Sequence, residues 1–208
     1  MTDHISSVRG RAPWAVVLLG LIAAIAGFAL LHVVNKLALG DRVMFALDGE
    51  GNLPTWFSST LFAVAGISAL AFALFDDRSR WLWVVVGLLF LGFSLDDSVG
   101  IHESTERREA SLSRLLVQPV IVAILAYALA VLGRRQPRPE RRLLVAAGVV
   151  IVVALAASLL NAYVDPPYSI LVSVQMLEET SEMIVPALVI AALVSATSRR
   201  FRATPART

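Results

Sequence analysis

The chain has 208 residues, of which 57% are apolar and only 16% are charged, and its mean hydropathy is +0.74. A soluble domain carries about 25% charged residues, so this composition argues against a soluble protein and also excludes intrinsic disorder. Cysteine is absent, which excludes disulfides, cysteine-ligated zinc and thiol nucleophiles. Three histidines are too few for an all-histidine metal cage.

Six segments are long and apolar enough to cross a bilayer whose core needs roughly 20 residues per helix. They are residues 13–34, 54–75, 81–101, 115–132, 143–163 and 168–197. The apolar runs are continuous and do not alternate as β-barrel strands would. The first run exceeds the apolar region of a signal peptide, so we expect it to stay as an anchor. The sequence therefore predicts an all-α integral membrane protein, with residues 1–208 forming one domain of six transmembrane helices.

The basic residues predict how the spans are oriented. With the N-terminus in the cytoplasm, the cytoplasmic segments hold 13 of the 18 arginine and lysine residues. This bias predicts a multipass protein of the plasma or bacterial inner membrane with both termini in the cytoplasm. The arginine-rich run 134–142 then becomes a cytoplasmic loop near anionic lipid headgroups. No nucleic-acid role is expected, because no aromatic or folded reading surface accompanies this run.

Polar residues in several spans fall at one depth. Counted at about 1.5 Å per residue from the inner face, Asp96 and Glu182 both lie roughly 22 Å up, although their spans run in opposite directions. His32 and Asn161 lie at roughly 27–28 Å on the same count. A carboxylate at this depth is costly and is usually functional. The pattern predicts one polar layer in the outer half of the membrane.

Two groups of candidate residues follow from this layer. The predicted metal ligands are Asp96, Asp97, His102, Glu103, Glu178, Glu179 and Glu182. The predicted supporting or substrate-contacting residues are His32, Glu50, Asn52, Asn161 and Gln175. Carboxylates without neutralising cations must be partly protonated, hydrated or bound to metal, and a set that includes histidine suits Zn, Mn or Fe. The i,i+3 spacing of Glu179 and Glu182 is also that of ligand pairs in di-metal helical bundles.

Three functions remain open at this point. The first is a metal-binding membrane protein acting on a lipid or lipid-linked molecule, with either hydrolysis by a metal-activated water or redox chemistry at a di-metal centre. The second is a proton- or cation-coupled transporter or channel, in which the acids carry the ions. The third is a non-catalytic subunit of a membrane complex or a homo-oligomer. The nearly apolar inner half of every span disfavours the second.

Three motifs resemble those of an uncharacterised group of small bacterial multipass membrane proteins. They are Glu50-Gly51-Asn52-Leu53-Pro54-Thr55-Trp56-Phe57-Ser58-Ser59, Ser94-Leu95-Asp96-Asp97 ending in His102-Glu103, and Glu178-Glu179 with Glu182-Met183. The chain is more loosely similar to the seven-span membrane zinc hydrolases of the alkaline ceramidase and adiponectin-receptor type. That similarity would imply zinc held by histidines with an aspartate and a serine, whereas this chain has six spans and one well-placed histidine.

Overall fold

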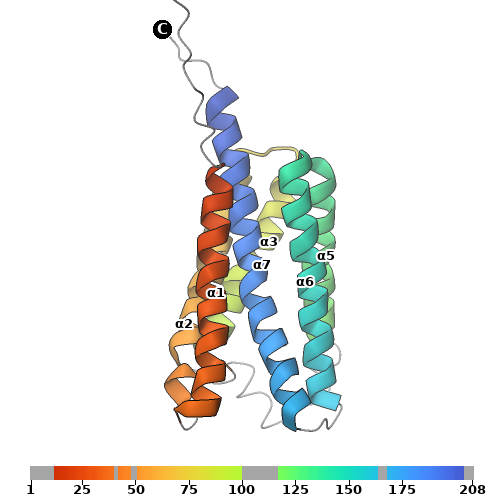
Figure 1. Cartoon of the computed structure of the whole chain (residues 1–208). Helices are drawn as coiled ribbons and strands as arrows, with labels where there is room; N and C mark the ends of the chain where they lie inside the picture. The colour runs from red at the N-terminus through yellow and green to blue at the C-terminus, as the bar shows by residue number, and fades with distance from the viewer. Residues whose placement is uncertain (1–11, 40–41, 48–50, 100–116, 164–167, 204–208) are drawn as a thin grey trace, which may run out of the picture.

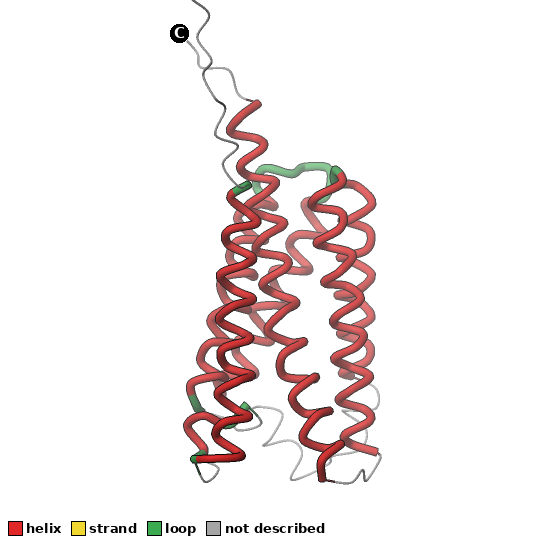
Figure 2. The backbone as a smooth tube through the Cα atoms, viewed as in Figure 1, coloured by secondary structure: helices red, strands yellow, loops and turns green. Residues whose placement is uncertain are grey.

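The computed structural model describes residues 12–39, 42–47, 51–99, 117–163 and 168–203. These residues form six long helices and one short 3-10 helix in a single bundle, so the predicted fold class is confirmed (Figures 1 and 2). The elements are α1 (Pro13–Ala38), η1 (Val43–Phe45), α2 (Leu53–Ala73), α3 (Arg80–Val99), α5 (Gln118–Arg135), α6 (Arg138–Tyr163) and α7 (Tyr168–Ala203). All six long helices are sufficiently long and apolar to cross a membrane. The protein is therefore a multipass protein of the lipid bilayer.

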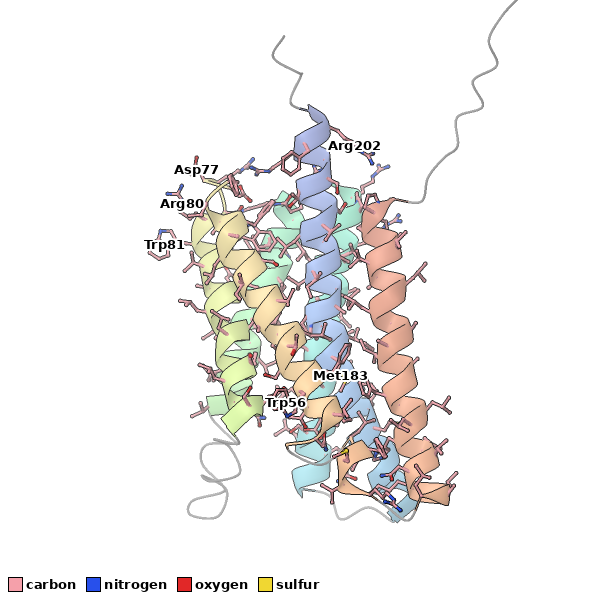
Figure 3. The ribbon with its side chains drawn as sticks, turned by 90° about the vertical axis from the view of Figure 1, so that its left-hand side faces the viewer. Trp56, Asp77, Arg80, Trp81, Met183 and Arg202 are labelled. Atoms are coloured by element: carbon pink, nitrogen blue, oxygen red, sulfur yellow. The ribbon has the colours of Figure 1, made fainter. Side chains whose placement is uncertain are left out.

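The bundle has two chemically different ends. We call the end where α1 begins and α7 finishes the terminal end, and the opposite one the polar end (top and bottom of Figure 1). In the side-chain view Asp77, Arg80 and Arg202 lie at the terminal end (Figure 3). The buried polar side chains of the described residues also divide between the two ends. At the terminal end they are Asp76, Ser79, Glu140 and Ser195, and toward the polar end they are His32, Asn35, Asn52, Ser58, Ser94 and Ser181.

An apolar core fills the middle of the bundle between these two polar groups. The last helix, α7, packs against α6, α1 and α2, while α2 packs against α3, and α5 packs against α6 and α3. Fully buried apolar side chains come from each of the central helices, among them Phe90, Leu125, Leu144 and Val189. Only 11% of the most apolar window of α1 is buried, against 67% for α7. The last helix is therefore the structural centre, and α1 lies at the periphery.

Two glycines permit a close contact between α2 and α3. A Cβ added to Gly66 would lie 2.9 Å from the carbonyl oxygen of Gly87, and one added to Gly87 would lie 2.7 Å from Cγ of Leu70. Real Cβ atoms essentially never lie within 3.0 Å of such neighbours, so any larger residue at either position would require the two helices to shift. Small residues of this kind let membrane helices approach closely where lipid gives no hydrophobic drive for association.

A buried carboxylate joins α6 to α7 at the terminal end. Glu140, in the first turn of α6, is only 1% exposed. Its Oε1 accepts a hydrogen bond of 2.8 Å from the Ser195 hydroxyl and lies 3.1 Å from a guanidinium nitrogen of Arg199. Its Oε2 is buried without a hydrogen-bond partner. The contact fixes the start of α6 against the last turns of α7.

A second carboxylate ties the α2–α3 connection to the α5–α6 turn. Asp76 accepts a 3.0 Å hydrogen bond from the indole N–H of Trp83 and a 3.3 Å one from the side-chain amide of Gln136. Trp83 is 1% exposed and is therefore a packed interior residue. Trp56 and Trp81, in contrast, are exposed near helix ends, where tryptophan is common in membrane proteins.

Two predicted boundaries are corrected by the structure. The first helix continues past residue 34 to Ala38, so the half-buried Lys36 belongs to a membrane helix at the polar end. The arginine-rich run 134–142 is also not one loop, because α5 ends at Arg135 and α6 begins at Arg138. Only Gln136 and Pro137 separate them. Both shifts have one reason: long cationic side chains extend a helix into the interface while their charges reach water.

The orientation of the bundle is a first testable prediction. We expect both termini to face the cytoplasm, because the basic residues are concentrated on that side. The cysteine-free chain allows single cysteines at positions 2 and 207 to be labelled with a membrane-impermeant maleimide. Labelling should require permeabilised cells. A cysteine on Met44 of η1, which is exposed, should react in intact cells, and the reverse pattern would overturn the orientation.

Candidate functional site at the polar end

The connection between α1 and α2 is held by side chains from the last turns of α1. His32 is buried, and its Nδ1 accepts a 2.8 Å hydrogen bond from the backbone N–H of Leu47. Asn35 is also buried; its Oδ1 accepts from the Arg42 N–H at 2.9 Å, and its Nδ2 donates to the Arg42 carbonyl at 3.0 Å. Because Nδ1 of His32 accepts this bond, any ligand role for the imidazole would fall to Nε2.

A third polar residue, Asn52, connects the same segment to α2. Its Nδ2 donates to the Ala46 carbonyl at 2.7 Å, and its Oδ1 accepts from the backbone N–H and the hydroxyl of Thr55 at 3.1 and 2.9 Å. Asn52 is thus the N-cap of α2, where an asparagine satisfies one of the free N–H groups of the first turn. His32 and Asn52, which the sequence predicts as supporting or substrate-contacting residues, make hydrogen bonds that hold the α1–α2 connection in place at the polar end.

Three serines join α2 to α3 near this end. The Ser59 hydroxyl lies 2.6 Å from that of Ser98 and donates to the Ser94 carbonyl at 2.9 Å. The Ser98 hydroxyl also donates to the Ser94 carbonyl, at 2.7 Å. The close approach of the two helices at Gly66 and Gly87 brings these small side chains within reach. Sequence reasoning missed this serine cluster, because isolated serines in apolar helices carry no charge signal.

The candidate carboxylates lie on two helices. Asp96 and Asp97 are half-buried in the last turns of α3. Glu178, Glu179 and Glu182 are half-buried in the part of α7 nearer the polar end, as is Gln175 about one turn before them. The helix is continuous through Pro186, and beyond it almost every residue up to Ala196 is buried or half-buried. The acids therefore occupy the less covered part of α7, and the apolar part forms the core.

The described residues do not gather these acids into a finished metal centre. No group of three or more histidine, aspartate and glutamate side chains in the described ranges is placed to hold a metal ion. Helix α2 packs against both α3 and α7 and so connects the two carboxylate-bearing helices. The predicted ligands His102 and Glu103, the predicted supporting residue Glu50 and the side chain of Asn161 lie outside the described residues. A site shared by α3 and α7 remains a prediction.

Comparison with known proteins adds the family. Neither the search of curated proteins nor the search of solved structures gave a match, so the similarity to membrane zinc hydrolases also remains a prediction. One family model matches the chain, over residues 10–197, which includes all six helices except the last turns of α7. Its description is a domain of unknown function, DUF8692. The chain therefore belongs to the DUF8692 family, a family of domains of unknown function.

Proposed function

We propose that this protein binds a divalent metal ion at the polar end and uses it on a lipid or lipid-linked substrate that enters from the outer side of the membrane. The proposed ligands are drawn from Asp96 and Asp97 on α3 and from Glu178, Glu179 and Glu182 on α7. His102 and Glu103 follow α3 in the sequence and complete the proposed set. Zn, Mn and Fe suit such a mixture of carboxylate and imidazole.

The kind of side chain at the polar end supports this proposal most directly. Five half-buried carboxylates lie in α3 and α7 at this end. Carboxylates that are partly removed from water are stable only when paired, hydrated, protonated or bound to a cation. A divalent ion bound by several of these carboxylates would give the two helices a common partner.

The packed middle of the bundle favours a binding site over a transport path. Between the two ends the buried side chains of the described residues are apolar, including Ala65, Val86 and Leu129, each of which is completely buried. An ion-conducting route needs polar groups or water along the whole path. The carboxylates at the polar end are therefore separated from the terminal end by an apolar middle, which favours binding at one end over passage through the bundle.

The chemistry available at such a site follows from the donor set. A bound metal would supply a Lewis acid and lower the energy of a water or a substrate oxygen that becomes negatively charged. A carboxylate not used as a ligand is a suitable general base. The serine cluster and the Asn52 cap keep α2 fixed against α3 and against the α1–α2 connection, which limits motion of the first of the two carboxylate-bearing helices.

Metal content tests the proposal. Protein purified in detergent should hold close to one metal ion per chain when measured by plasma mass spectrometry. Asp96→Asn and Glu182→Gln should each lower the metal affinity at least about tenfold and so leave the purified protein largely without metal, because loss of one charged ligand costs more than about 1.4 kcal/mol of binding free energy. The double variant should add little, because the site is already empty.

A matched control comes from the opposite end of the bundle. Asp77 is an exposed carboxylate paired with Arg80, so Asp77→Asn should leave the metal content unchanged. Metal-free wild-type protein with an intact fold would overturn the proposal. So would unchanged metal content in both single variants and the double variant, together with equal or higher thermal stability, because the acids would then be structural.

A further inference from the structure

A separate feature at the terminal end of the bundle points to a second ligand. An open hollow of about 260 Å³ lies against the start of α6, lined by Arg138, Arg141, Arg142 and Val145. These positions follow the i, i+3, i+4, i+7 spacing of a single helix face. All four residues are exposed, so three arginines line one small volume on the outside of the bundle.

The charge in this hollow lacks a counter-ion from its own helix. The acidic residue of the first turn, Glu140, is 1% exposed and faces Ser195 and Arg199 of α7. Cations in the first turn of a helix are also unfavourable, because the N-terminus carries the positive end of the helix dipole. Three like charges at this position therefore favour an anion that accepts several N–H bonds, and arginine pairs with phosphate oxygens in a bidentate manner.

The helix surface beyond the hollow identifies the source of that phosphate. Val149 and Val152 continue the stripe of Val145 at spacings of four and three, and they are 58% and 51% exposed. Val149 lies about 10 Å further along the helix axis than Arg142, and so deeper in the span. A phosphate group at the arginines with an acyl chain along the valines is the arrangement of a phospholipid.

We propose that the arginines at the start of α6 form a binding site for an anionic phospholipid, whose headgroup phosphate contacts Arg138, Arg141 and Arg142 and whose acyl chain lies on the valine stripe. This site is separate from the polar end and does not depend on the proposed metal. It would hold the α5–α6 hairpin at the level of the headgroups, where Gly133 of α5 already lies close to Val145 and the Arg141 carbonyl.

Native mass spectrometry of the intact chain in a neutral detergent tests this site. Wild-type protein should retain phosphatidylglycerol in preference to phosphatidylcholine. Arg141→Gln with Arg142→Gln should weaken phosphatidylglycerol binding about 10- to 30-fold, because both residues lose their charge-assisted hydrogen bonds to the headgroup phosphate. The affinity of Arg141→Lys with Arg142→Lys for phosphatidylglycerol should lie between those of the wild type and the glutamine pair, because the charge remains but the bidentate geometry is lost.

The control removes the same charge elsewhere on the terminal end. Arg78 and Arg202 are exposed and lie outside the hollow, so Arg78→Gln with Arg202→Gln should change binding less than twofold. Equal losses in the two glutamine pairs would overturn a defined site. Equal retention of both lipids by wild-type protein would overturn it without any variant. Competition by inorganic phosphate at the concentration of the lipid would show that the valine stripe contributes nothing, and would reject a lipid as the ligand.

Discussion

Replacing Arg199 with methionine is expected to destabilise the bundle by about 2 kcal/mol. Removing one partner of a fully buried ion pair costs about 3–5 kcal/mol, because the other charge is left buried. Here the remaining charge belongs to Glu140, which is almost completely buried, but the removed Arg199 side chain is 45% exposed, so water already weakens the pair. Glu140→Gln should cost less, because the amide oxygen can still accept from Ser195.

The measurement for this pair is thermal or denaturant unfolding in detergent, followed by helix signal. Arg202→Met removes a cation from the same exposed end of α7 and is the matched control. The double variant Arg199→Met with Glu140→Gln should recover most of the stability, because no buried charge is left unpaired. If Glu140→Gln proved more damaging than Arg199→Met, the contact would be a packing feature and not a charge pair.

The second large effect is expected from Gly66→Ala. The new methyl group would lie 2.9 Å from the Gly87 carbonyl oxygen and 2.9 Å from Cγ of Leu91, so α2 and α3 must separate. Overpacking of this kind costs about 1–3 kcal/mol, which outweighs the gain of roughly 1 kcal/mol that alanine brings over glycine inside a helix. We expect a net loss of stability.

A control within the same helix pair keeps this test sharp. A Cβ on Gly92 of α3 meets no atom within 4 Å, so Gly92→Ala should be neutral or stabilising under the same unfolding conditions. The serine cluster lies across the α2–α3 contact, so Gly66→Ala should also loosen that end of the interface. Equal stability of the Gly66 and Gly92 variants would show that α2 and α3 do not pack through these glycines.

The spans were predictable because one physical quantity, the length of an apolar run, decides them. Hydropathy failed only where charges join a membrane helix. Lys36 lies in α1 and Arg138 begins α6, although both lie outside the predicted spans 13–34 and 143–163. The same effect hid Glu140, which the sequence places in a cytoplasmic loop but the structure buries against Ser195 and Arg199. A charge can belong to either environment, and tertiary contacts decide which.

The polar layer was only partly predictable for a different reason. The carboxylates in α3 and α7 are visible in the sequence because charges in apolar runs are rare. The partners of His32 and Asn52 are backbone groups of Leu47 and Ala46, and no side-chain pattern marks a backbone atom as a partner. The serine cluster depends on how closely two helices approach, which the sequence shows only through the need for glycine at two positions.

The peripheral position of α1 has a consequence for how the chain is made. Helix α1 is synthesised before the five other long helices described, yet the helix it packs against most extensively is α7, which is synthesised after them (Figure 1). During synthesis α1 therefore stays surrounded by lipid until α7 is inserted. Its apolar surface suits this state, because only 11% of its most apolar window is buried even in the finished bundle. Docking of α1 thus depends on completion of α7. A chain that ended before α7 would leave α1 without the helix it packs against.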